Sequence, residues 1–169
     1  MSLSVGATWQ YRLQGAINTG FDVDVYDIDL FDAPNATIAS LTAAGRHVVC
    51  YFSAGTYEDW RPDAEEFDEA VIGNPLEDWA GEWYLDIRAQ NVKDIMLSRM
   101  QLAKDKGCSG VEPDNVQNFQ EDSGWAEFAA SPHDLVLQSR LSATRTHAFQ
   151  VGARCPSCKS CCCACSCRA

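Results

Sequence analysis

Residues 35–55, with the sequence NATIASLTAAGRHVVCYFSAG, decide the fold of this 169-residue chain. Asn35 can cap a helix that contains Ile38 and ends at Gly45. A continuous apolar run at 48–52 follows at once, and a strand that is apolar on both faces is typical of a parallel sheet covered by helices. This stretch therefore predicts a helix and then a buried strand in an α/β fold.

The alternation of strand and helix continues on both sides of this stretch. It predicts a parallel sheet, either doubly wound or closed into a barrel. Because no expected strand is followed by a glycine-rich phosphate-binding turn, the barrel is favoured. The expected strands are 8–13, 23–30, 47–52, 82–87, 110–114 and 149–151, and two further helices are expected at 91–107 and 131–147.

Polar and charged residues gather where the expected strands end. In a barrel of parallel strands, these carboxyl ends form the face that carries the active site. The pattern therefore favours a (β/α)8, or TIM-type, barrel. The residues at these ends are Asp29, Asp32, Ser53, Asp86, Arg88, Glu112, Asp114 and Asn115.

The length of the chain conflicts with a complete barrel. A full eight-stranded barrel takes about 250 residues, and at most five to six strands are expected here. We therefore predict an incomplete barrel over 1–151, followed by an irregular Cys-rich tail at 152–169 that holds seven of the nine cysteines. We interpret the tail as disordered or as an off-frame or wrongly spliced translation, with a metal-binding tail as the alternative.

The charge and hydropathy of the sequence argue against some classes of binding partner. The chain has 13 Lys and Arg against 24 Asp and Glu, a net charge of −11 that argues against nucleic acid and favours cationic ligands. No apolar run approaches the roughly 20 residues of a membrane span. The first 13 residues lack the pattern of a signal peptide, so we expect no export signal in the chain as written.

The histidines and the two cysteines outside the tail suggest no metal site. The three histidines share no ligand spacing. Cys50 lies within an expected strand and Cys108 at a junction between helix and strand, where we expect small buried thiols. We therefore predict neither a metal nor a cofactor for the body of the chain.

Five blocks of sequence occur in a characteristic order. Together they resemble glycoside hydrolase family 114, the endo-α-1,4-polygalactosaminidases, whose domain is a TIM-type barrel. Ordered blocks of this kind are far more specific than one short motif. The blocks are TWQYRL at 8–13, VYDIDLFD at 25–32, CYFSAG at 50–55 with WRPD at 60–63, WYLDIR at 83–88, and GCSGVEPDNV at 107–116.

The last block contains the candidate catalytic residue. Alternation along a strand places Glu112 and Asp114 on the same side, at the carboxyl end. Glycoside hydrolysis uses two carboxyl groups, one of which protonates the leaving oxygen. The resemblance implies that Asp114 is catalytic. Its partner in the family, a Glu on a later strand, has no counterpart because the sequence diverges after Val151, and the activity of this chain is therefore left open.

The resemblance also implies the substrate, an α-1,4-linked galactosamine polymer whose free amines would be cationic and suit an acidic cleft. It further implies secretion, and we expect a monomer if the domain is complete. An aromatic face such as that of Tyr51 can pack against a sugar ring. The candidate substrate-binding residues are Asp29, Tyr51, Ser53, Asp86, Glu112 and Asn115.

Simpler interpretations compete with these roles. Asp114 could cap a loop, and Arg61 and Arg88 could form loop-shaping ion pairs with the neighbouring Asp63 and Asp86. A non-catalytic carbohydrate-binding pseudoenzyme and a metal binder that acts through the tail are the two other functions that the sequence leaves open.

Overall fold

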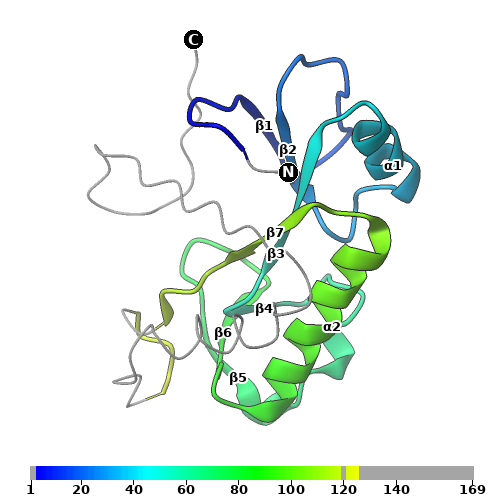
Figure 1. Ribbon diagram of the computed structural model, residues 1–169. Coiled ribbons are helices and arrows are strands. Elements are labelled where there is room, and N and C mark those ends of the chain that lie inside the picture. Colours follow the sequence, from blue (N-terminus) through cyan, green and yellow to red (C-terminus); the bar gives the residue numbers. More distant parts are fainter. Residues whose placement is uncertain (1–2, 119–120, 126–169) are drawn as a thin grey trace.

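The computed structural model describes residues 3–118 and 121–125. A parallel sheet and a smaller antiparallel sheet form the framework, with two α-helices beside them (Figure 1). The elements are β1 (Trp9–Arg12), β2 (Val25–Asp29), α1 (Asn35–Ala43), β3 (His47–Ser53), β4 (Thr56–Glu58), two 3-10 turns (Ala64–Glu66 and Glu69–Val71), β5 (Ile72–Pro75), β6 (Glu82–Leu85), α2 (Gln90–Lys106) and β7 (Gly110–Asp114).

The parallel sheet has the order β1-β2-β3-β7 and confirms the predicted α/β fold. Helices α1 and α2 lie on one side of it, as Figure 1 shows. The residues of β2 and β3 that point toward the helices are apolar, so their burial holds the two layers together. This cluster contains Tyr26, Ile28, Leu30, Ile38, Leu41, Val48, Cys50, Phe52 and Ala103.

The ends of the helices agree with the predictions to within one or two residues. Pro34, rather than Asn35, occupies the N-cap of α1. Gln90 begins α2, and Gly107 ends it with a φ of 88°, a conformation that glycine adopts without steric cost. In the described part of the chain, neither helix has the length and apolar character that a membrane crossing requires.

The strand predicted at 82–87 is misplaced in the sequence interpretation. Strand β6 lies between β4 and β5 in a three-stranded antiparallel sheet, and β3 pairs directly with β7. The short β5 and β6 follow each other closely in the chain, so they pair as neighbours instead of crossing over a helix. The described residues therefore contain four parallel strands, which form an open sheet. The helix expected at 131–147, the strand at 149–151 and the tail at 152–169 lie outside the described residues.

The expectation of two free buried thiols is wrong, because Cys50 and Cys108 form a disulfide with a Cα–Cα distance of 6.0 Å. The two residues are 58 positions apart in the sequence. Direct pairing of β3 with β7 places Cys50 beside Val111, close to the start of β7 where Cys108 lies. The sequence interpretation had placed another strand between them, and the disulfide could not be expected from it.

Candidate active site

The face of the parallel sheet opposite the helices carries most of the predicted site residues. Strand register places Asp29, Tyr51 and Glu112 in one row across β2, β3 and β7. The next row pairs Ser53 with Asp114. Paired residues of neighbouring strands point to the same side of a sheet, so these five side chains share one face.

Asp114 is held by a hydrogen bond from Tyr51, whose hydroxyl oxygen lies 2.9 Å from Asp114 Oδ2. Burial and then the negative charge of Asp114 raise the pKa of the Tyr51 phenol above its usual value. The phenol therefore stays protonated and acts as a donor. Tyr51, expected from the sequence as a surface for sugar rings, thus orients the carboxyl group of Asp114.

A second pair of acids lies deeper on the same face. Burial, and then the charge of Glu112, raise the pKa of Asp27 to about 9, while burial raises the pKa of Glu112. Among the described residues, no N–H or O–H group donates to Asp27 Oδ1 or Glu112 Oε2, and the two carboxyl groups are hydrogen-bonding neighbours. A proton held between them satisfies both groups, and the pair carries one negative charge instead of two.

Asp29 is bound on both of its oxygens. Oδ1 accepts hydrogen bonds from the backbone N–H groups of Phe31 and Asp32, at 2.8 and 2.9 Å. Oδ2 lies 2.8 Å from a guanidinium nitrogen of Arg61, which also binds both oxygens of Glu58. The contacts of Asp29 are therefore structural, and they join the end of β2 to β4.

The expected pairing of Arg61 with Asp63 is wrong. Arg61 bridges two other carboxylates, and Asp63 binds Arg99 from α2 at 2.8 Å through both of its oxygens. Arg99 also donates a 2.7 Å hydrogen bond to the carbonyl oxygen of Ser53. A buried arginine of α2 therefore fixes the end of β3, next to the candidate site.

Asp86 does not lie on the face of the parallel sheet. It follows β6 in the antiparallel sheet and accepts hydrogen bonds from the guanidinium of Arg88 at 2.8 and 3.0 Å. These bonds lower the pKa of Asp86 below its usual value. The loop-shaping ion pair expected for these two residues is therefore present.

Ser53 and Asn115 belong to a polar network that includes Thr56 and Glu82. Asn115 Nδ2 donates to Ser53 Oγ at 2.9 Å, Ser53 and Thr56 are joined through their hydroxyl groups, and Thr56 Oγ1 donates to Glu82 Oε2 at 3.1 Å. Glu82 was missed in the sequence interpretation, because the first residue of a parallel strand would lie at the end of a barrel away from the active site. Burial, and then the charge of Glu58, raise the pKa of Glu82 to about 7.

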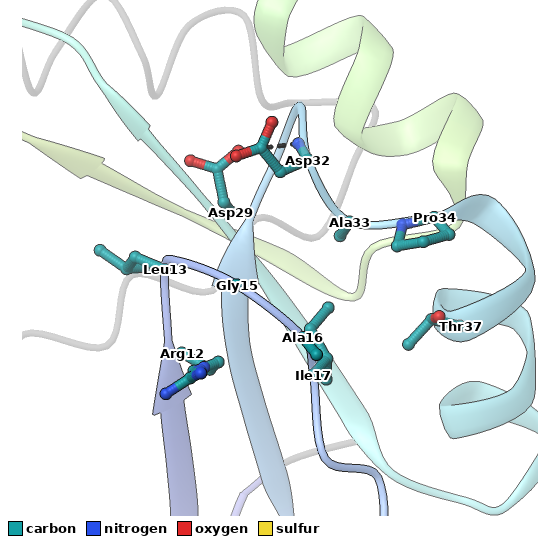
Figure 2. A pocket seen from close by; sticks show the side chains of 10 residues that line it. All are labelled: Arg12, Leu13, Gly15, Ala16, Ile17, Asp29, Asp32, Ala33, Pro34 and Thr37. Atoms are coloured by element: carbon teal, nitrogen blue, oxygen red, sulfur yellow. Dashed lines mark hydrogen bonds between the residues drawn. The ribbon is translucent and has the colours of Figure 1, made fainter.

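A hollow of about 290 Å³ lies beside this face, at the carboxyl ends of β1 and β2. Figure 2 shows the carboxyl groups of Asp29 and Asp32 on one side of it and Thr37 of α1 on the other. Arg12 also lines the hollow. The rest of its lining is largely apolar, with Leu13 and Ile17 among it, and Asp29 connects the hollow to the ion pairs of Arg61.

The sequence matches a known protein family over most of its length. The family model Glycoside-hydrolase family GH114 matches residues 1–152. The chain belongs to glycoside-hydrolase family GH114. The predicted resemblance to this family is therefore confirmed, and membership places the chain among glycosidases by relationship.

Solved structures of GH114 proteins agree with this assignment. Aspergillus fumigatus Ega3, solved in complex with galactosamine, is 47% identical with a TM-score of 0.75. The match covers 79% of this chain and 54% of Ega3, so the chain spans about half the length of that relative. No curated protein matches the chain.

The glycoside hydrolase domain of Pseudomonas aeruginosa PelA shares the fold. It is 17% identical with a TM-score of 0.56, and the match covers 67% of this chain and 45% of PelA. A variant of the same domain gives 18% identity and a TM-score of 0.53. The four parallel strands are thus similar to part of the TIM-barrel structures of GH114 proteins, although the described strands do not close into a barrel.

Proposed function

We propose that this chain is a glycoside hydrolase that cleaves α-1,4 bonds in a galactosamine-containing polysaccharide, with Asp114 as a catalytic carboxylate. Membership in GH114 and 47% identity to a protein solved with galactosamine support this class of substrate. The observation that carries the proposal is the 2.9 Å hydrogen bond from Tyr51 to Asp114 on an otherwise acidic face. This bond fixes the orientation of one carboxyl group on that face.

The proton shared by Asp27 and Glu112 supports this role for Asp114. Three fully ionised carboxylates so close together would repel one another strongly. When one proton stays between Asp27 and Glu112, the neighbouring Asp114 experiences less negative charge. We therefore propose that the buried pair limits the negative charge beside Asp114 while its own proton remains in place.

The remaining candidate residues are proposed to bind or to position the substrate. Asn115 follows Asp114 directly and Glu112 lies two residues before it, and we propose that both contact the sugar. Asp29 and Ser53 are buried and bonded within the protein, which favours a positioning role for both. We propose that Asp86, at the end of β6, reaches a more distant sugar of the same polymer.

The acidic surface suits a polymer with free amines. Long-range attraction between a cationic chain and an acidic face raises the rate of association and weakens as salt is added. We propose that partly de-acetylated polymer is the preferred form. An oxidising compartment is proposed as the site of action, since the disulfide between Cys50 and Cys108 is typical of secreted proteins.

The test is release of reducing ends from α-1,4-linked polygalactosamine by the purified full chain. Asp114→Asn should lower the rate by about 10² to 10⁴, the usual contribution of a catalytic acid or base. Asp105→Asn is the matched control, because Asp105 is an exposed residue of α2 that bonds only to Gln101 in the described structure. Equal cleavage by wild type and Asp114→Asn would contradict the assignment, and retention on the polymer without cleavage would indicate a carbohydrate-binding protein instead.

A further inference from the structure

A buried chain of polar groups connects the antiparallel sheet to the candidate active site. It begins at Glu82 in β6, runs through Thr56 at the start of β4 and Ser53 at the end of β3, and reaches Asn115 after β7. Ser53 and Thr56 are completely buried, and Glu82 is 8% exposed. Water is therefore largely excluded from the middle of this chain, and its members depend on one another for hydrogen bonds.

An ionised Glu82 fixes the direction of the two bonds made by the hydroxyl groups of Thr56 and Ser53, whereas the amide nitrogen of Asn115 donates whatever the charge of Glu82. A carboxylate can only accept, so Thr56 must donate its hydroxyl proton to Glu82. Ser53 must then donate to Thr56, because the single hydroxyl proton of Thr56 is already used. The oxygen of Ser53 is left as an acceptor for the side-chain amide of Asn115 at 2.9 Å.

The far end of the chain lies beside the proposed catalytic residue. Asn115 follows Asp114 directly and has a φ of 59°, a left-handed conformation that Asn tolerates better than most residues. Gly55 lies against this turn, where any side-chain carbon would overlap the carbonyl oxygen of Asn115. The position of the Asn115 amide thus depends on close packing of its backbone and on its hydrogen bonds to Ser53 and Thr56, at 2.9 and 3.3 Å.

We propose that Glu82 is a positioning residue, which acts through Thr56 and Ser53 to hold the Asn115 amide beside Asp114. The catalytic role of Glu82 rests on the proposed function. The coupling between Glu82 and Asn115 across the two sheets rests on the hydrogen bonds alone.

The groups that face Glu82 make this coupling sensitive to pH. Glu58 is its direct partner across β4 and β6, Asp114 approaches from β7, and Arg61 opposes both with a positive charge. Burial and the two acids outweigh the hydrogen bond from Thr56 and the charge of Arg61, which brings the pKa of Glu82 to about 7. Once protonated, Glu82 can donate to Thr56, so the hydroxyl groups of Thr56 and Ser53 lose their fixed direction.

The first test follows the side-chain amide of Asn115 by NMR in the full chain between pH 5 and 9. We expect its signals to shift with a midpoint near pH 7 in the wild type and to lose that transition in Glu82→Gln, which keeps an acceptor and does not titrate. Thr56→Val should abolish the transition because it removes the hydroxyl group that links Glu82 to Ser53. Thr56→Ser keeps a hydroxyl group and should restore the transition. An unchanged transition in Glu82→Gln or Thr56→Val would overturn the proposal, as would its absence from the wild type.

The second test measures cleavage of polygalactosamine. With a midpoint near pH 7, the wild-type kcat should fall about tenfold from pH 8 to pH 6, and this fall should be lost in Glu82→Gln. A fall that persists in Glu82→Gln contradicts the positioning role. If no variant cleaves the polymer, the proposed function fails, while the NMR titration still decides whether Glu82 is coupled to Asn115.

Discussion

Replacing Asp27 with Asn should stabilise the folded protein, and the gain should grow as the pH rises. Asp27 is 3% exposed, lies next to Glu112, and has a pKa raised to about 9 by burial and by that neighbour. Ionising it in the folded state is therefore costly. Asn has nearly the same shape, cannot ionise, and can donate a hydrogen bond from its amide to Glu112.

The magnitude follows from the two pKa values of Asp27. Below about pH 4 the carboxyl group is protonated in the folded and the unfolded chain, and it contributes no pH dependence. Between the unfolded value of 3.8 and the folded value of about 9, the unfolded chain releases a proton that the folded chain keeps, so stability falls as the pH rises. The upper limit of this slope is about 1.4 kcal/mol per pH unit.

The assay is urea denaturation of the full chain at pH 5, 6, 7 and 8. The difference in unfolding free energy between Asp27→Asn and the wild type should increase steadily over this range, toward a limit of about 4 kcal/mol between the two ends. Asp105→Asn, on the exposed side of α2, is the control and should give a difference that does not change with pH. A constant or decreasing difference for Asp27→Asn would refute the shared proton.

Three further variants test contacts that hold the candidate site. Changing both Cys50 and Cys108 to Ala should lower the free energy of unfolding by about 4 kcal/mol for a separation of 58 residues, and a reductant should then have no further effect on the denaturation curve. Arg61→Met leaves two buried carboxylates without their cation and should cost about 3–5 kcal/mol; a loss below 1 kcal/mol in urea denaturation would show that they are solvated. Tyr51→Phe removes the donor to Asp114 and should lower kcat roughly tenfold to a hundredfold without unfolding the protein, which circular dichroism checks; an unchanged kcat would exclude this hydrogen bond from catalysis.

Local patterns were sufficient to predict the helices and the central strands. The spacing of apolar residues and the stop at Gly107 depend only on neighbouring positions, and α2 ends there as predicted. The shared position of Asp29, Tyr51 and Glu112 could also be predicted, because the carboxyl ends of parallel strands meet at one edge of the sheet. These predictions required no knowledge of which strands are neighbours beyond the alternating order.

Long-range pairing could not be predicted from the same patterns. The segment at 82–87 alternates as a strand should, but its pattern does not distinguish a parallel partner from an antiparallel one. Counting this segment as a parallel strand placed Glu82 at the end of the sheet away from the active site. It also placed a strand between Cys50 and Cys108, although β3 and β7 are direct neighbours. One error in strand order therefore accounts for both the missed acid and the missed disulfide.

The two faces of the parallel sheet differ in how much they stabilise the fold. The face toward α1 and α2 is apolar and tightly buried, as a core that serves only the fold should be. The opposite face keeps Asp27 and Glu112 in surroundings that raise their pKa values, and it is bordered by Asn115 with a positive φ. Apolar residues at these positions would make a more stable sheet, so stability does not explain their presence. Perturbed acids and a positive-φ turn beside one carboxylate are the arrangement expected where side chains serve chemistry, which supports the role proposed for Asp114.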